Sequence, residues 1–201
     1  MTEQTSTIER LMQATKTEVC AAIQQYAAPG QENYPLLAVA TSRALDLYKR
    51  NKKGATGAFV QSLCTAARGL AKSGESTILA GAAIQQAVVI AHHAVKNIRH
   101  ELFADYAFQV RGHALEALVD VAAAFPPASV QRVHLIADWG GKYFDICSEA
   151  AERAAPLMLA SALSSDLDMK WRHMAVQHAR AYGNGPVRRE AYEVHLPAPA
   201  P

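Results

Sequence analysis

The chain has 201 residues, of which 50% are hydrophobic, 19% are charged and only 7% are aromatic. Its 20 Lys and Arg residues nearly balance its 18 Asp and Glu residues, and the net charge of +2 excludes a strongly basic or strongly acidic chain. A chain of this length buries one sizeable core and is short for two full domains.

Apolar residues recur at helical spacing in nearly every segment. Because few residues are aromatic, alanine and aliphatic side chains supply the packing, which lets helices approach one another closely. The sequence therefore predicts a soluble all-α protein. We expect a single-domain bundle of about six to eight helices over residues 1–183 and an extended Pro-rich C-terminal arm over residues 184–201.

The first third of the chain predicts three helices. The capping pattern Ser6-Thr7-Ile8-Glu9 begins a helix that ends at Pro29-Gly30. A second helix has Pro35 in its first turn, where proline is tolerated. The third spans Gly57 to Ser73, and Gly74 is its C-terminal stop.

The segment from Ser76 to Phe125 keeps a helical pattern without proline. One helix of that length would far exceed the typical length of about 10 to 14 residues, so we expect a break between Asn97 and Asp105. The apolar run from Ile78 to Ala91 is shorter than the roughly 20 residues that cross a membrane, which indicates a buried helix and no membrane partner. The polar residues Met1 to Thr5 predict no secretory signal peptide.

Proline, glycine and capping residues divide the second half of the chain. Ser129 is expected to cap a helix, and Pro156 is expected to kink or restart it. Ser165 or Asp166 is the expected cap of the last helix, which Gly183 ends.

The C-terminal arm differs in composition from the rest of the chain. Its glycine and proline residues argue against a helix, and Tyr192, Val194 and Leu196 alternate with polar residues. An extended arm of this kind adds a strand to a partner's sheet or lies in a groove as polyproline II. We therefore assign Tyr192, Val194 and Leu196 to oligomer contacts, with a frayed terminus as the alternative.

The three cysteines, Cys20, Cys64 and Cys147, lie far apart among apolar helical positions. An odd number of cysteines without a Cys-x-x-Cys pair argues against a disulfide framework or a zinc ribbon. We expect buried free thiols in a reducing compartment, hence a cytoplasmic protein or a component of a particle assembled in the cytoplasm, such as a virion.

Basic residues are concentrated in one part of the sequence. Seven Lys and Arg residues and a single acid, Asp46, occur between Arg43 and Lys72, a local net charge of +6. The densest part, residues 49–57, joins two predicted helices and leads into the free backbone N–H groups of the second. This arrangement predicts a site for an anion, a nucleic acid or an acidic protein surface, with a solvated basic turn as the alternative. The candidate residues are Arg43, Lys49, Arg50, Lys52, Lys53, Thr56, Arg68 and Lys72.

Histidines and carboxylates on two neighbouring predicted helices form a second candidate site. On each helix they are spaced to share one face, and antiparallel packing would bring two imidazoles and three carboxylates together. Such a set binds a divalent metal or performs acid–base chemistry, but these positions lie opposite the apolar stripes, which favours a solvated face. The residues are His113, Glu116, Asp120, His134 and Asp138.

Three functional hypotheses remain. The favoured one is a non-enzymatic structural or protein-interaction subunit that self-assembles through helix faces and the C-terminal arm. The second is a nucleic-acid-binding protein that uses residues 43–72, and the third is a metal-dependent or acid–base enzyme built on His113 to Asp138. Because no nucleotide-binding, nucleophile-elbow or di-metal motif occurs in the sequence, we expect no cofactor. The expected partners are the chain itself, another protein or a nucleic acid.

Overall fold

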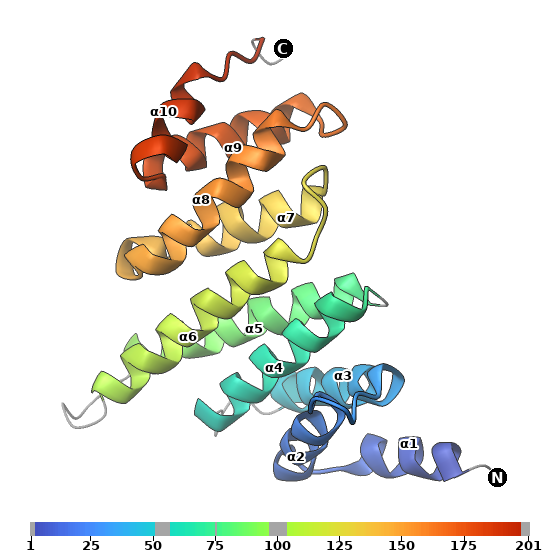
Figure 1. Ribbon diagram of the computed structural model, residues 1–201. Helices are drawn as coiled ribbons and strands as arrows, with labels where there is room; N and C mark the ends of the chain where they lie inside the picture. Colours follow the sequence, from blue (N-terminus) through green and yellow to red (C-terminus); the bar gives the residue numbers. More distant parts are fainter. Residues whose placement is uncertain (1–2, 51–56, 75, 97–103, 198–201) are drawn as a thin grey trace. The chain divides into compact units, whose positions relative to one another are not determined.

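The structure, a computed structural model, describes residues 3–50, 57–74, 76–96 and 104–197. Every regular element in these ranges is helical, which confirms the predicted all-α class (Figure 1). The ten α-helices found there exceed the predicted six to eight. The chain divides into two compact units, unit 1 (Met1–Ala117) and unit 2 (Leu118–Pro201), and each is considered by itself.

Unit 1 contains five helices and most of a sixth: α1 (Glu3–Gln13), α2 (Lys16–Tyr26), α3 (Tyr34–Arg50), α4 (Gly57–Ser73), α5 (Thr77–Lys96) and α6 (Ala104–Ala123). Unit 2 contains the end of α6 and the following elements: α7 (Val130–His134), a π-helix (Leu135–Gly140), a 3-10 turn (Phe144–Ile146), α8 (Ser148–Leu163), α9 (Met169–Tyr182) and α10 (Gly185–Glu193). Helices that are neighbours in sequence pack together, notably α2 with α3, α4 with α5, α8 with α9, and α9 with α10.

Alanine forms much of the core, as expected from the composition. The paired helices of each unit carry alanines with no exposed surface, and this lets their backbones approach closely. In unit 1 these include Ala66, Ala67, Ala80, Ala83, Ala87 and Ala91; in unit 2 they include Ala150, Ala154, Ala155, Ala162, Ala175 and Ala179.

The helix predicted from Ser6 to Pro29 is instead two helices, separated at Ala14 and Thr15. The Thr15 hydroxyl accepts a hydrogen bond from the Glu18 backbone N–H, and the Glu18 carboxylate accepts one from the Thr15 N–H at 2.7 Å. This reciprocal capping box begins α2, whereas α1 already begins before Ser6. The same hydrogen bonds from Thr15 hold the pKa of Glu18 below its usual value.

The next two helices agree with the prediction. Pro35 lies in the first turn of α3, and α4 has the predicted bounds. Gly74 follows α4 with a φ of 71°, the left-handed conformation that glycine adopts without strain. The break expected between Asn97 and Asp105 falls mostly on residues 97–103, which lie outside the described residues.

In unit 2 the first predicted helix is short and irregular. Ser129 occupies the N-cap position of α7, but its side chain makes no capping hydrogen bond. The π-helix follows at once and ends at Gly140, where a Cβ atom would collide with the ring of Phe144. Helical structure then resumes as α8 at Ser148, so the restart predicted at Pro156 is wrong, because that proline lies inside α8.

The predicted cap of α9 is wrong, whereas its predicted end is confirmed. Asp168, and not Ser165 or Asp166, caps α9, because its carboxylate accepts a hydrogen bond from the Lys170 N–H at 2.9 Å. Gly183 ends α9 as predicted.

The predicted extended arm is not confirmed, because the chain forms α10 directly after Asn184. Pro186 lies in the first turn of α10, where its missing N–H would have had no helical partner. Ala191 has no exposed surface, and α10 packs against α9. Pro186 lies at the start of α10 and Pro197 follows its end, so neither proline interrupts the helix.

Arg180 of α9 holds the end of α10 in place. Its guanidinium donates hydrogen bonds to the backbone carbonyls of Ala191 at 2.9 Å and Val194 at 3.0 Å, and it lies 5.3 Å from the centre of the Tyr192 ring. Further along, His173 Nε2 lies 2.7 Å from the Pro197 carbonyl oxygen. The segment after α10 therefore folds back along α9 of its own chain.

The same kind of bond recurs at four other helix ends. The last carbonyls of an α-helix have no partner within the helix, and their negative partial charge attracts a cation. An arginine from elsewhere in the chain donates to carbonyl oxygens at or just beyond the ends of α1, α6, α8 and α9: Arg43 to Ala14, Arg132 to Ala122, Ala123 and Phe125, Arg172 to Ala162, and Arg188 to Ala181.

Two of the buried titratable groups have strongly shifted pKa values. His178 of α9 is 7% exposed, with its ring centre 5.5 Å from that of Phe144 and 4.7 Å from that of Tyr182. Burial disfavours the charged imidazole and lowers the pKa of His178 to about 4. Burial likewise raises the pKa of the Cys64 thiol to about 12. All three cysteines are free, but Cys20 and Cys147 are only half-buried.

Arg132 provides a test of the capping contacts. The side chain of Arg132 is almost fully buried, so the Arg132→Ala variant removes its hydrogen bonds to three backbone carbonyls, of which that of Ala122 keeps a bond from the Phe125 N–H. We expect the free energy of unfolding to fall by about 3 kcal/mol, measured by urea denaturation. The matched variant Arg189→Ala removes an exposed arginine of α10 and should change it by less than about 0.5 kcal/mol. Equal effects of the two variants would contradict a capping role.

His178 makes stability depend on pH. Because the unfolded chain takes up a proton near pH 6.5 and the folded chain only near pH 4, stability is constant above this window and falls as the pH drops through it. The expected loss from this group is about 3 kcal/mol at pH 4. Urea denaturation of the wild type and of His178→Gln should differ progressively between pH 6.5 and 4, and a pH-independent difference would contradict the burial effect.

Candidate functional site

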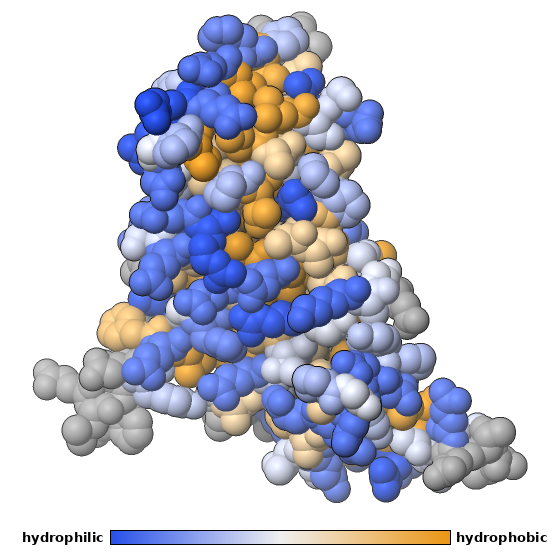
Figure 2. All heavy atoms as spheres, in the orientation of Figure 1, coloured by the Kyte–Doolittle hydropathy of each residue, from blue (hydrophilic) through white to orange (hydrophobic). Residues whose placement is uncertain are grey.

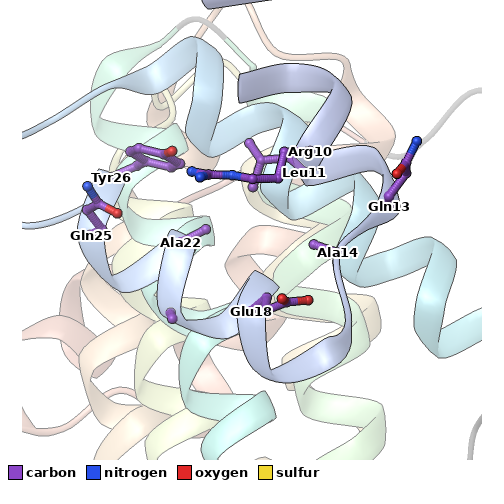
Figure 3. A pocket seen from close by; sticks show the side chains of 9 residues that line it. Arg10, Leu11, Gln13, Ala14, Glu18, Ala22, Gln25 and Tyr26 are labelled. Carbon is purple, nitrogen blue, oxygen red and sulfur yellow. The ribbon is translucent and has the colours of Figure 1, made fainter. Parts of the chain in front are cut away.

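An open groove of about 420 Å³ lies between α1 and α2 in unit 1 (Figure 3). Its floor is formed by small and aliphatic side chains: Leu11, Ala14, Ala21 and Ala22. Its rim carries the exposed polar side chains Arg10, Gln13, Glu18 and Gln25, and the buried Tyr26 completes the lining. An apolar floor with a polar rim is the geometry in which a helix or an extended peptide docks.

The two charges of the rim lie in different parts of the groove. Figure 3 shows the Arg10 side chain extended across the opening towards the ring of Tyr26, while Glu18 lies near Ala14. The Glu18 carboxylate is held by the backbone N–H and the hydroxyl of Thr15, each at 2.7 Å, which fixes its position. A segment that binds in the groove therefore contacts one cation, Arg10, and one anion, Glu18, whose position is fixed.

Some of the predicted basic residues form ion pairs or cap a helix, and others are exposed. Arg43 Nη1 and Arg50 Nη2 lie 3.3 Å and 3.0 Å from the Asp46 carboxylate, and Arg43 also caps α1. Lys49 is exposed. The predicted residues Lys52, Lys53 and Thr56 lie outside the described part of the chain.

The other two predicted basic residues lie elsewhere on unit 1. Arg68 and Lys72 are in the second half of α4, about 17 Å and 23 Å beyond Gly57 along the helix axis at 1.5 Å per residue. They line a separate pocket of about 240 Å³ together with Tyr34 and Thr65. Among the described candidates, Arg43 and Arg50 therefore pair with Asp46, whereas Arg68 and Lys72 line a separate pocket.

An aromatic residue that no sequence pattern indicated lies beside the start of α4. Tyr106 of α6 is 51% exposed, and a Cβ atom at Gly57 would overlap its ring. The ring of Tyr48 stacks on that of Phe59, with their centres 6.4 Å apart. Nothing in the local sequence indicated Tyr106, because the contact joins residues that are far apart in the chain.

The predicted histidine and carboxylate cluster includes two residues of unit 1. His113 Nε2 lies 3.4 Å from Nη1 of Arg68, which makes the imidazole an acceptor for the guanidinium. Glu116 is half-buried one turn further along α6.

The three other members of the cluster belong to unit 2, and each has a partner. Asp120 accepts a hydrogen bond from Arg153 of α8, and Asp138 Oδ2 lies 2.7 Å from His134 Nδ1 on the same stretch of helix. Among the residues that the structure describes, no group of three or more His, Cys, Asp or Glu side chains is placed to hold a metal ion.

A shallow pocket of about 400 Å³ lies between the end of the π-helix and α9. Asp138, Lys142, His178 and Tyr182 are among its lining residues. The Tyr182 hydroxyl donates a hydrogen bond to Asp145 at 3.2 Å. Burial, followed by the charge of that carboxylate and this hydrogen bond, raises the pKa of Tyr182. The sequence pattern did not reveal this pocket, because it depends on a π-helix that hydrophobic periodicity does not distinguish from an α-helix.

The exposed side of α8 becomes apolar in its second half. Pro156, Ala160 and Leu163 are exposed, and their spacing places them on one face of the helix. Leu163 retains 52% of its surface. Figure 2 shows hydrophobic side chains on this side of unit 2, where Figure 1 draws α8 and α9, between hydrophilic flanks.

One described helix is long and apolar enough, by length and composition alone, to cross a membrane: Thr77–Ala94 in α5. The core helix of a soluble protein meets the same criteria, and Ala83, Ile84, Ala87 and Val88 of this helix have no exposed surface within unit 1. A single segment of this kind is weak support for a membrane span.

Comparisons of the chain with known protein families, with curated proteins and with solved structures found no match.

Proposed function

We propose that the protein is a non-enzymatic structural or interaction subunit that self-associates in the cytoplasm through helix faces. The observation that carries this proposal is the exposed apolar stripe of α8, formed by Pro156, Ala160 and Leu163. Three apolar residues in register on the solvent side of one helix gain free energy when another surface covers them.

The groove between α1 and α2 is the surface that complements this stripe. The small side chains Pro156 and Ala160 permit close approach of a helix, and Leu163 supplies the larger group that an apolar floor accommodates. Exposed Glu149 and Glu152 precede the stripe on α8 and are opposite in charge to Arg10 on the rim of the groove. The proposed occupant of the groove is therefore α8 of a second copy.

This contact joins two different surfaces, one on unit 1 and one on unit 2. A head-to-tail contact of this kind leaves one stripe and one groove unfilled at the ends of any open assembly. The proposed assembly therefore grows until it closes into a ring or continues as a filament.

Size-exclusion chromatography with light scattering, over a range of concentrations, tests the contact. Burial of a leucine side chain is worth about 2 kcal/mol, so the double variant Ala160→Glu, Leu163→Glu should weaken self-association by more than tenfold. Ala21→Arg, which introduces a long cation at an exposed position of the groove, should have the same effect.

The matched control is Ile78→Glu, because Ile78 is 77% exposed on α5 and lies outside both surfaces. It should leave association unchanged. A monomeric wild type at all concentrations, or equal weakening by the control, would contradict the proposal.

The C-terminal residues predicted for oligomer contacts have a smaller part in this proposal. Val194 and Leu196 are half-buried in the segment that folds back along α9, whereas Tyr192 remains 60% exposed on α10. Only Tyr192 therefore offers a large free surface to a neighbouring copy, and Tyr192→Ser in the same light-scattering series measures its contribution.

Nucleic-acid binding is the second candidate function, and one observation favours it. Tyr106 provides an exposed ring beside Gly57, directly after the basic segment 49–56. Bases stack on such rings, and neighbouring lysines neutralise phosphates.

Fluorescence anisotropy with a labelled single-stranded oligonucleotide tests this candidate. Replacing Lys52 and Lys53 with alanine should lower the slope of log affinity against log salt by one to two, because each lost phosphate contact removes about one. Tyr106→Ser should weaken binding by about tenfold without changing the slope. Unchanged affinity and slope in both variants would exclude this surface.

A further inference from the structure

The 240 Å³ pocket of unit 1 lies between the α2–α3 connection and the second half of α4. Thr65, Arg68 and Lys72 are spaced by three and four residues, so they share one face of α4. Tyr34, at the start of α3, lines the same pocket. Two cations and two hydroxyl groups, contributed by two helices, therefore line one small cavity.

Gly69 lies on the same face of α4, between the two cations. A Cβ atom there would come within 2.9 Å of the Leu37 side chain, so the absence of a side chain lets α3 approach α4 closely. The close approach places the start of α3, with Tyr34, next to the cationic face of α4.

The described lining of this pocket carries more positive than negative charge. Arg68 is half-buried and is positioned by its contact with His113 Nε2 at 3.4 Å, while Lys72 is exposed. Among the described lining residues the one carboxylate belongs to Glu32, and its Oε2 accepts a hydrogen bond from the Gly30 N–H at 2.8 Å. The cations therefore outnumber the anion, and the anion is already hydrogen-bonded within its own loop.

We propose that this pocket binds a phosphate group, either as free phosphate or as the terminal group of a small phosphate monoester. The planar guanidinium of Arg68 matches two phosphate oxygens, Lys72 adds a point charge, and the Thr65 and Tyr34 hydroxyls donate to the remaining oxygens. A volume of 240 Å³ is below the range of about 300–1,000 Å³ for sites of drug-sized ligands, which limits the ligand to a small one.

Isothermal titration calorimetry at pH 7.5 and low ionic strength, with inorganic phosphate and separately with glycerol 3-phosphate, tests the site. Binding should have one-to-one stoichiometry. We expect Arg68→Gln to weaken it by at least tenfold and Lys72→Gln by about fivefold. Glu32→Gln should strengthen it by about threefold, because it removes the opposing charge, an effect that loss of structure cannot imitate.

The matched control is Lys49→Gln, an exposed lysine of α3 outside the pocket, which should leave the affinity unchanged. If Arg68→Gln loses helicity, the exposed positions Lys72 and Glu32 decide the question. Tighter binding of glycerol 3-phosphate assigns the site to an ester, and tighter binding of inorganic phosphate assigns it to the free ion. Absence of binding of both, or an equal loss in Lys49→Gln, would overturn the proposal.

Discussion

The structure depends on hydrogen bonds from arginine side chains to the carbonyls at helix ends. Small alanine side chains let the helices pack closely, but apolar packing does not satisfy the carbonyls at the helix ends. Arginines supply what the small side chains lack, because one guanidinium binds several carbonyls and offsets the helix dipole. Arg132 at the end of α6 and Arg180 at the end of α10 show this most fully, with three and two carbonyl partners.

This use of arginine explains why a count of charges along the sequence does not reveal the role of a single arginine. A count of charges along the sequence selected Arg43 as part of an anion site, yet its guanidinium caps α1 and pairs with Asp46. Arg68 also has a tertiary contact, with His113 of α6. Sequence spacing cannot separate a capping arginine from a ligand-binding one, because the carbonyls that it caps lie far away in the chain.

The start or end of a helix was predictable where a single residue restricts the backbone at its own position. Pro35 and Gly74 marked the start of α3 and the end of α4, since each restricts the backbone at its own position. Thr15 and Glu18 form a capping box that is equally visible in the sequence, but the apolar stripe that continues across it masked the break. The helix α10 was missed for the opposite reason: Pro186 indicated an extended chain, whereas the buried Ala191 and the contact with Arg180 favour a helix.

The most direct measurement of the capping contacts is hydrogen exchange at arginine Nε–H groups, followed by NMR on the folded protein. Arg43, Arg132, Arg172 and Arg180 all donate through Nε to a backbone carbonyl. Their Nε–H signals should be well dispersed and should exchange slowly, while those of the exposed Arg10 and Arg189 should exchange rapidly. Equally rapid exchange at all six positions would contradict the view that arginine capping defines the helix ends of this protein.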